Sequence, residues 1–422
     1  MSKKLLQINP VLRTNTSTGR IMKEIGELAI ANGWESYVAY SRGRDGLRES
    51  TSIPVPVGDR LSVAMHGLQT RLLDRHGLAS DAATRSFIRR IEEIAPDIIH
   101  IHNIHGYFLN YRILFDYLAH SGVQVIWTVH DCWLYTGHCY YYSKVRCARW
   151  KTGCGHCPQK RKFPQSWFID RSAKNFVDKK EAFCSIPNDR LTIVPVSDWI
   201  RNEMAESFLK NCRFRVIHNG IDTEMFSPRP QSDADVRSRY GIGDRKIILG
   251  VASIWSEEKG LMDFIRMAGK INEDEVIVLV GMDREDLDRF LRDAGAESLR
   301  HKFITVRRTE NAHQLAELYS AASELVNPTW QDNYPTVNLE SISCGTPVVT
   351  YRTGGSVEAV DNETGYIVNQ GDVDGLLLAV REIEALGKDH FLNNCRKCAV
   401  ENFRKEDRYA DYIHLYQQLL KK

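Results

Sequence analysis

Short apolar runs and amphipathic helical segments alternate along the first half of the chain. The first apolar run, residues 5–8, is followed by a polar loop and by a helical pattern over residues 20–31, which Asn32-Gly33 would end. A long helical pattern covers residues 61–94. Further strands are predicted at residues 36–40, 97–102, 123–130 and 191–196. Strands that alternate with helices are typical of a parallel sheet with helices on both faces.

The same alternation restarts after residue 219. Residues 227–238 are rich in Pro, Asp, Ser and Arg, which is typical of an interdomain linker. Near the end, Tyr409, Tyr412 and Tyr416 recur at helical spacing. The strands predicted here are residues 246–251, 275–281, 302–306, 324–327 and 347–350. The expected fold class is therefore α/β, with two doubly wound domains and ligands at the carboxyl ends of the strands, in a cleft between the domains.

Composition excludes several classes of protein. The 422 residues suffice for two domains, and 43% hydrophobic with 26% charged residues is ordinary for a globular chain. The formal net charge of +2 excludes nucleic-acid binding through bulk charge. No apolar run approaches the ~20 residues of a membrane-spanning helix. The apolar patch near the first residue is too short for a signal peptide, so a cytoplasmic protein is expected.

The stretch over residues 327–358 carries the most chemistry. A predicted strand ends here, a polar loop contains Asp332, and a short helix runs from about Thr336 to just before Gly345. A helix N-terminus suits an anion, and the carboxylates of Asp332 and Glu340 can accept hydrogen bonds from sugar hydroxyls. The alternative is that Asp332 only caps the helix and that Glu340 faces solvent.

This stretch resembles a known family. Asp332-x7-Glu340, followed by CGTPVVTYRTGG-x2-E, is similar to the E-x7-E region of retaining nucleotide-sugar glycosyltransferases of family 4, which have the GT-B fold. The resemblance is closest to the bacterial enzymes of capsule, exopolysaccharide and O-antigen synthesis. Four further pieces match in order along the chain: Thr18-Gly19-Arg20, TVHD at residues 128–131, VIHNGID at residues 216–222, and Lys259-Gly260.

The resemblance implies a domain organisation. The GT-B fold has two Rossmann-like domains that face a central cleft. Residues 1–218 would form the N-terminal, acceptor-side domain, with a cysteine-rich insertion at residues 132–165. Residues 219–402 would bind the nucleotide sugar. A C-terminal helix over residues 403–422 would return to the N-terminal domain.

The resemblance also implies a role for each matching residue. Lys259 would neutralise the donor diphosphate, Gly19 would let the backbone approach it, and Glu340 would bind the ribose hydroxyls. Asp332 would contact the transferred sugar, and His130, at the end of a buried strand, would face the reacting sugar. The predicted catalytic residues are thus His130, Asp332 and Lys259. The backbone of four residues would line the sugar and phosphate pocket: Asn333, Tyr334, Pro335 and Thr336.

Two positions depart from the family pattern. The first acid of the pair is Asp332, which is one methylene shorter than Glu. Six residues before Lys259 the family commonly has Arg, and here Ser253 stands in the donor site instead. Arg307 or Arg308, or a divalent metal, could supply the missing charge. No Asp-x-Asp stands in a context typical of metal-dependent GT-A enzymes, so no essential catalytic metal is expected.

A histidine-rich strand end is a candidate acceptor site. His100 and His102 share one face of the predicted strand, and His105 lies past its end. We expect Asn103, His105 and Tyr107 to recognise the acceptor. A metal site on the alternating histidines is the alternative.

Four cysteines are spaced like zinc ligands. They occur as Cys139-x7-Cys147-x6-Cys154-x2-Cys157, in a segment rich in Gly, aromatic and basic residues with little apolar patterning. Thiolates bind zinc tetrahedrally, and the metal would stabilise a segment that cannot form a core of its own. We expect one structural zinc ion here; the alternative is an ordinary loop with reduced cysteines.

The function expected from the sequence is that of a retaining glycosyltransferase of the hexosyltransferase class. It would move a sugar from a UDP- or GDP-sugar to a saccharide or polyprenyl-linked saccharide, without nucleic acid. Basic and aromatic residues of the N-terminal half suit a peripheral contact with the inner face of the cytoplasmic membrane, or are a solvated charged face. The alternatives are a sugar-nucleotide epimerase or phosphorylase of the same fold, and a non-enzymatic zinc-containing carbohydrate-binding protein.

Overall fold

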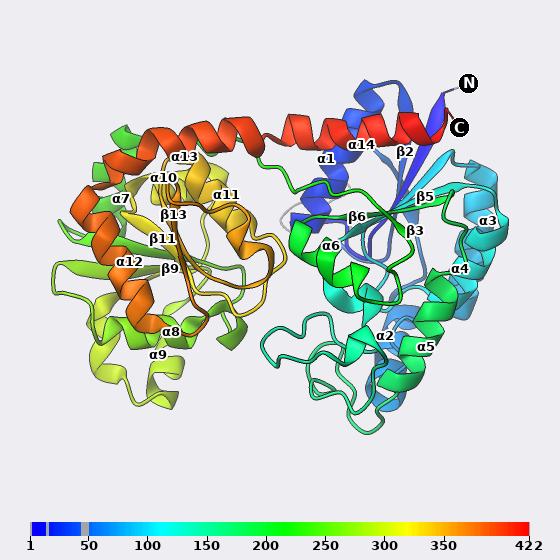
Figure 1. Cartoon of the computed structure of the whole chain (residues 1–422), viewed down its shortest axis with the longest axis horizontal. Helices are drawn as coiled ribbons and strands as arrows, with labels where there is room; N and C mark the ends of the chain where they lie inside the picture. Colours follow the sequence, from blue (N-terminus) through cyan, green and yellow to red (C-terminus); the bar gives the residue numbers. More distant parts are fainter. Residues whose placement is uncertain (1, 14–16, 44–49, 422) are drawn as a thin grey trace. The chain divides into compact units, whose positions relative to one another are not determined.

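The computed structural model describes residues 2–13, 17–43 and 50–421. The chain forms two compact units, drawn in Figure 1. The N-terminal unit consists of Met1–His218 and Arg408–Lys422, and the C-terminal unit of Asn219–Asp407. Each unit contains one parallel sheet with helices packed on it, which confirms the α/β class and the two doubly wound domains.

The sheet of the N-terminal unit has seven strands in the order β3-β2-β1-β4-β5-β6-β7. All neighbours pair in parallel, and the order reverses direction between β1 and β4. In doubly wound sheets ligands bind at such a switch point, beyond the carboxyl ends of the strands. The strands are β1 (Lys3–Ile8), β2 (Trp34–Tyr40), β3 (Ile53–Pro56), β4 (Ile98–Ile101), β5 (Gln124–Val129), β6 (Leu191–Pro195) and β7 (Arg213–Phe214).

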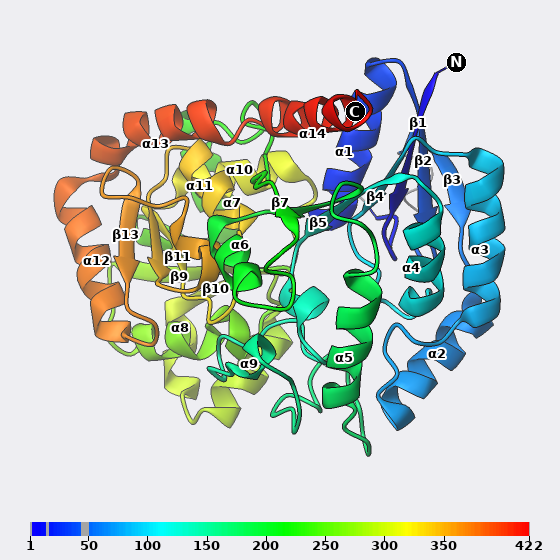
Figure 2. The same cartoon turned by 45° about the vertical axis from the view of Figure 1, so that its right-hand side comes forward.

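Helices bury apolar side chains against both faces of this sheet. On one face α3 and α4 lie side by side and, with Phe183 of α5, cover Ile99, Val125 and Trp127 (Figures 1 and 2). On the other face α1 and α14 cover Ile98 and Ile126. The helices of this unit are α1 (Ser17–Ala31), α2 (Arg60–Leu73), α3 (Asp81–Ile94), α4 (Tyr111–His120), α5 (Ser172–Phe183), α6 (Asp198–Ala205) and the greater part of α14 (Lys405–Leu419).

The C-terminal unit is built on a six-stranded parallel sheet in the order β10-β9-β8-β11-β12-β13. Its four central strands are almost fully buried, as expected for a parallel sheet covered on both faces. The strands are β8 (Lys246–Val251), β9 (Glu275–Val280), β10 (Phe303–Val306), β11 (Glu324–Asn327), β12 (Val348–Tyr351) and β13 (Gly365–Val368). The helices are α7 (Asp233–Tyr240), α8 (Leu261–Ala268), α9 (Arg284–Asp293), α10 (Ala312–Ala321), α11 (Thr336–Ser343), α12 (Val373–Leu386) and α13 (Lys388–Asn402).

Two elements differ from the sequence prediction. The helical pattern over residues 61–94 is two helices, α2 and α3, because Asp74 at the end of α2 adopts a left-handed backbone (φ 51°) and Gly77 follows at φ 74°. Residues 227–238 are not the interdomain linker. They lie within the C-terminal unit, where Val236 of α7 is buried and Arg239 pairs with Glu317 of α10 at 2.9 Å.

Short strands at the sheet margins were not predicted from the sequence. β3 (IPVP) contains two prolines, β7 (RF) has only two residues, and β13 (GYIV) begins with glycine, all of which weaken the signal for a strand. No helix among the described residues is both long and apolar enough to cross a membrane.

The C-terminal helix completes the core of the N-terminal unit. Tyr409, Tyr412 and Tyr416 of α14 are buried beside α1, the helix drawn in blue next to it in Figure 1. The Tyr416 hydroxyl lies 2.7 Å from Nδ1 of His100 on β4, and Nε2 of His100 lies 2.7 Å from Oγ1 of Thr128 on β5. A helix from the end of the chain thus satisfies a histidine buried in the sheet.

Tyr416→Phe should destabilise the N-terminal unit. The change keeps the buried ring but leaves His100 without one hydrogen-bond partner, which costs about 1–3 kcal/mol for a buried polar group. Urea denaturation, with hydrogen exchange to assign the loss to this unit, measures the effect. The control is Tyr117→Phe, which removes the hydroxyl of a partly buried tyrosine on α4. Equal stability of the two variants would contradict the role of this hydrogen bond.

Candidate functional site

Two loops of the C-terminal unit are held together at the carboxyl edge of its sheet. One follows β8 and ends in the short 3₁₀ turn Glu257–Lys259; the other follows β11. The Trp330 N–H donates to the Glu258 carbonyl at 2.9 Å, and the Thr329 hydroxyl donates to the same oxygen at 3.2 Å. Gly260 allows this approach: it has φ 75°, and a Cβ there would lie 2.2 Å from the Pro328 carbonyl oxygen.

Lys259 and Asp332 meet as a consequence. The Lys259 ammonium nitrogen lies 2.7 Å from Oδ2 of Asp332, 73 residues away in sequence. The lysine side chain is 39% exposed and the aspartate 15%. Because an ammonium group has three N–H donors, Lys259 retains hydrogen-bonding capacity toward a further acceptor.

The helix α11 begins beside this pair. Pro335 occupies its N-cap position and provides no side-chain hydrogen bond to the first turn, while Oδ1 of Asp332 accepts from the Asn333 N–H at 2.9 Å. Asn333, Tyr334 and Pro335 are buried, and Thr336 is partly buried. The helix start therefore offers partial positive charge next to the Lys259 ammonium, which suits a phosphate group.

Glu340 lies on α11 and is only 4% exposed. Its Oε2 accepts a hydrogen bond from the Tyr319 hydroxyl of α10 at 3.1 Å. The alternative in which Asp332 caps the helix and Glu340 faces solvent is therefore wrong: the cap position is Pro335, and Glu340 is buried.

A buried polar network, which was not predicted from the sequence, connects α11 with the ends of β11 and β12. Asn338 accepts from Asn327 Nδ2 at 2.8 Å and donates to the Ser356 carbonyl at 3.0 Å. The Ser356 hydroxyl lies 2.7 Å from that of Thr350. The network fixes the glycine turn at Gly354, which has φ 53°. The only signal in the sequence is an Asn in the middle of a short helix, where this residue is unfavourable; that Asn338 is fully buried is seen only in the structure.

The two remaining donor-site predictions, Ser253 and Arg307, are exposed at the same edge of the sheet. Ser253 lies in the loop after β8, close to the 3₁₀ turn that carries Lys259. Arg307 follows β10, which is separated from β8 by β9, or roughly 10 Å at ordinary strand spacing. No direct contact between Arg307 and Lys259 is seen among the described residues.

In the N-terminal unit, histidines gather at the carboxyl ends of β4 and β5. His130 follows β5, and its Nε2 lies 3.4 Å from Nδ1 of His102, with the rings stacked at 17°. His102 Nε2 lies 3.0 Å from Oε1 of Gln7 on β1. The rings of His100 and His102 are 4.1 Å apart, which confirms that they share a face of the strand. Burial lowers the pKa of His130 to about 4, so its imidazole is neutral near pH 7.

Next to His130, His105 Nε2 contacts Oδ2 of Asp131 at 2.7 Å. Oδ1 of Asp131 accepts from the Trp133 N–H at 2.9 Å. Burial raises the pKa of Asp131, but His105 and the Trp133 N–H outweigh burial and lower it overall. Asp131 therefore orients His105. From the sequence it was noted only as the last residue of the TVHD motif.

The other N-terminal predictions lie around this group. Asn103 follows β4 and lines the same small cavity as His105 and His130. Tyr107 has a left-handed backbone (φ 68°), and its ring contacts the Arg71 guanidinium at 5.9 Å. Gly19 is buried in the first turn of α1; the three residues before that helix, 14–16, lie outside the described part. The four predicted zinc ligands lie between β5 and α5, around a separate cavity.

Comparison with known proteins identifies the class. Residues 18–225 match the model of Glycosyltransferase Family 4, and residues 245–385 match that of Glycosyl transferases group 1. The two regions together cover most of the chain. It belongs to the family 4 glycosyltransferases and has their GT-B fold, as the resemblance implied.

Individual relatives agree with this assignment. The chain is 24% identical to a putative colanic acid biosynthesis glycosyl transferase of Escherichia coli, WcaC, over 98% of this chain and all of that one. It is similar in structure to sucrose-phosphate synthase of Thermosynechococcus elongatus, with a TM-score of 0.73, 16% identity and 99% of each chain covered. It is also similar to the Anabaena protein HepE in complex with UDP-glucose: TM-score 0.69, 14% identity, 98% of this chain and 99% of that one.

Acid should destabilise the N-terminal unit partly through His130. The ordinary pKa of histidine, about 6.5, is restored on unfolding, whereas the folded value is about 4. The unfolded chain therefore takes up a proton that the folded chain does not. Stability is fully present above pH 6.5 and falls toward pH 4 by about 1.4 kcal/mol per pH unit for this residue.

Urea denaturation of the His130→Gln variant between pH 4.5 and pH 7.5 measures the contribution of His130 to the pH dependence of the free energy of unfolding. The variant should show a shallower loss of stability with falling pH than the parent protein. His120→Gln, which removes an imidazole at the exposed end of α4, is the matched control. An unaltered slope in His130→Gln would mean that His130 titrates normally in the folded unit.

Proposed function

We propose that this glycosyltransferase retains the configuration of a sugar that it moves from a nucleotide-sugar donor to a saccharide or polyprenyl-linked saccharide in cell-surface polysaccharide synthesis. The observation that carries the proposal is the pairing of Lys259 with Asp332 beside the start of α11, with buried Glu340 on the same helix. The similarity to the putative colanic acid biosynthesis glycosyl transferase of Escherichia coli supports a polysaccharide product.

The C-terminal unit supplies the groups that a nucleotide diphosphate sugar requires. As the glycosidic bond breaks, negative charge develops on the leaving diphosphate, and Lys259 with the N–H groups of α11 stabilises it. We propose that Arg307 and the loop that contains Ser253 bind the remaining phosphate oxygens. Glu340 is proposed to accept hydrogen bonds from the ribose hydroxyls, and Asp332 from the transferred sugar. UDP and GDP are the proposed carriers; the HepE structure, which contains UDP-glucose, supports the former.

Retention follows from attack on the face that the diphosphate leaves. The acceptor hydroxyl forms the new C–O bond to the anomeric carbon, the C–O bond to the diphosphate breaks, and a diphosphate oxygen takes the hydroxyl proton. This step needs stabilisation of charge rather than a protein nucleophile, and we propose no essential catalytic metal for it.

For the N-terminal unit we propose contacts with sugar hydroxyls. The neutral imidazole of His130 can either donate or accept a hydrogen bond, and its stacking on His102 fixes the ring. We propose that the His105–Asp131 pair, together with Asn103 and Tyr107, binds the acceptor. These residues follow the carboxyl ends of the adjacent strands β4 and β5, and doubly wound sheets bind ligands at that edge.

A peripheral membrane contact is proposed for α2, because its burial pattern is inverted. His66, Gly67 and Thr70 are buried, whereas Leu61, Met65 and Leu68, on one side of the helix, are 70%, 47% and 42% exposed.

The loop beside α2 continues this apolar surface. The Trp167 N–H donates to the Arg71 carbonyl at 2.7 Å, and Trp167 and Phe168 are 44% and 70% exposed. Arg161 and Lys162 are exposed just before them. Apolar side chains flanked by cations suit an anionic lipid surface, such as the inner face of the cytoplasmic membrane, where a polyprenyl-linked acceptor resides.

The test of the function is a screen of UDP- and GDP-sugars for donor hydrolysis and for transfer to lipid-linked saccharides, with NMR of the first-formed anomer. We expect one donor to be consumed and its anomeric configuration to be kept. An inverted product would refute retention, and conversion of the donor sugar into its epimer without release of nucleotide would refute transfer.

Lys259→Ala should lower kcat/KM for the donor by roughly 10–150-fold, because loss of a charge-assisted hydrogen bond costs about 1.5–3 kcal/mol. Glu340→Gln should weaken donor binding in the same direction, since a neutral amide accepts hydrogen bonds less strongly. Steady-state kinetics and calorimetry with the nucleoside diphosphate measure both. Lys270→Ala, on the same unit but paired with Asp374 on the surface, is the control. Parent-like kinetics in both site variants, with folding intact, would exclude this donor site.

Replacing Leu61 and Leu68 together by Asp should weaken binding to vesicles that contain phosphatidylglycerol by roughly tenfold or more, since two apolar side chains no longer enter the lipid and two anions are repelled. Co-sedimentation with anionic and with neutral vesicles measures this. Replacing Leu378 and Leu386 together by Asp places the same charge on α12, at side chains that are 66% and 50% exposed, and this variant should bind like the parent. Equal binding by all three proteins would show that α2 does not contact lipid.

A further inference from the structure

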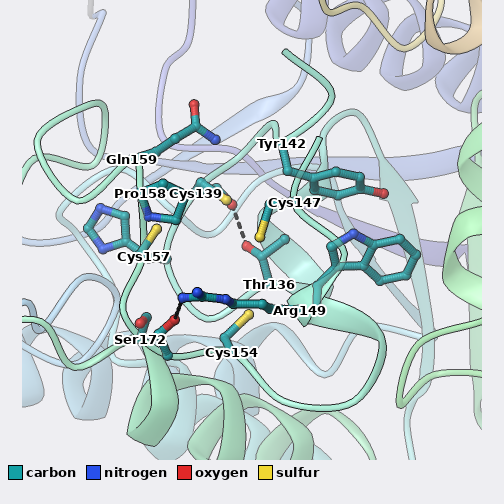
Figure 3. Close-up of a pocket in the computed structure, with 13 residues that line it drawn as sticks. Thr136, Cys139, Tyr142, Cys147, Arg149, Cys154, Cys157, Pro158, Gln159 and Ser172 are labelled. Atoms are coloured by element: carbon teal, nitrogen blue, oxygen red, sulfur yellow. Dashed lines mark hydrogen bonds between the residues drawn. The ribbon is translucent and has the colours of Figure 1, made fainter. Parts of the chain in front are cut away.

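The segment between β5 and α5 is built around one cavity rather than around helices. Its described secondary structure is limited to two short 3₁₀ turns, Cys132–Tyr135 and Arg149–Lys151. The cavity measures about 20 Å³, and its lining includes all four cysteines of the predicted cluster: Cys139, Cys147, Cys154 and Cys157. Figure 3 shows their sulfur atoms turned toward the same space from separate stretches of the loop.

The chain around the cavity places one backbone N–H against a cysteine sulfur and holds the turn between two of the cysteines. The Gly137 N–H donates to the Cys154 sulfur at 3.2 Å. Gly137 packs so closely that a Cβ there would lie 2.7 Å from that of Cys154. The Arg149 guanidinium donates to the carbonyl of His156 at 2.7 Å and also contacts that of Gly155, so it fixes the two-residue turn between Cys154 and Cys157. Such outer contacts orient ligands before a metal binds.

Two buried nitrogen atoms at the cavity are left without hydrogen-bond partners. These are Nε2 of His138 and Nε1 of Trp150, which belong to residues 2% exposed and line the cavity. Nδ1 of His138 is held by Oδ1 of Asp74 at 2.7 Å, an arrangement frequent around metal sites. Buried nitrogens without partners beside a cavity call for an explanation such as an ion or a water molecule that occupies it.

A buried cation lies on the other side of the cluster. Lys179 of α5 is 1% exposed, donates to the carbonyls of Trp133 at 2.6 Å and Thr136 at 2.9 Å, and lies 3.5 Å from the centre of the Trp133 ring. No carboxylate within 4 Å pairs with it among the described residues. Burial lowers the pKa of Lys179 to about 7, while negative charge on Cys154 and Cys139 acts in the opposite direction and raises it. A buried lysine without a carboxylate partner is stabilised in its charged form by nearby negative charge, and a zinc ion with four thiolates carries a net charge of −2.

We propose that Cys139, Cys147, Cys154 and Cys157 bind one structural zinc ion that holds the β5–α5 segment in place. Among the described residues, no three of these sulfurs all lie within 4.8 Å of one another. Tetrahedral zinc with Zn–S bonds of about 2.3 Å brings sulfurs to about 3.8 Å, so the ion draws the thiolates inward. The site is separate from the donor residues, and its test does not depend on the proposed function.

The test is the metal content of the full chain, purified without an affinity tag or metal column, by mass spectrometry of the elements. We expect about one zinc per chain in the parent and in Cys184→Ser, whose thiol is exposed elsewhere in this unit. Cys154→Ser and Cys157→Ser should each fall below roughly 0.2 zinc per chain. Chelation should lower the melting temperature of the parent and of Cys184→Ser but not of the two cluster variants.

A second measurement uses only the parent protein and therefore tests the site even if the cysteine variants fold poorly. In the parent protein, cadmium exchanged for zinc should give the ultraviolet charge-transfer absorption of cadmium bound to thiolates. Zinc near zero in the parent, with unchanged melting in chelator, would overturn the proposal. So would a disulfide between any two of the four cysteines in the native protein, or loss of zinc in Cys184→Ser equal to that in Cys154→Ser.

Discussion

The close approach of Gly260 to Pro328 is the constraint on which the proposed donor site depends. A side chain at residue 260 would overlap the Pro328 carbonyl, and the backbone there is left-handed. With glycine the two loops can hydrogen-bond directly, and the Lys259 ammonium reaches Asp332 at the start of α11. The positive charge that we propose for stabilising a leaving diphosphate is thus placed by a contact between two backbone segments.

The fold could largely be predicted from the sequence where strands are fully buried. Glu275–Val280 and Lys246–Val251 are continuous apolar runs, and their structural bounds agree with prediction to within a residue. The prediction failed where local signals are weak or misleading. β13 has only four residues, α7 is polar apart from Val236, and the break between α2 and α3 depends on backbone angles at Asp74 and Gly77 that no periodicity reveals.

The candidate site was predictable only in part, and for a related reason. The resemblance identified Lys259, Asp332 and Glu340 individually, but spacing could not show that a lysine would contact an aspartate 73 residues later. Asn338 and Asp131 were missed as positioning residues because their importance lies in what they touch across the fold. Polar side chains inside a core carry information that only the three-dimensional contacts make visible.

The path of the chain through the two units has a consequence for synthesis. Residues of α14 bury three tyrosines in the N-terminal unit, although the whole of the C-terminal unit, Asn219–Asp407, precedes them in the sequence. The residues that complete the core of the N-terminal unit are therefore the last to be synthesised. A chain truncated before residue 408 would contain every residue of the C-terminal unit, but β4 and α1 would lack the tyrosines of α14 that cover them.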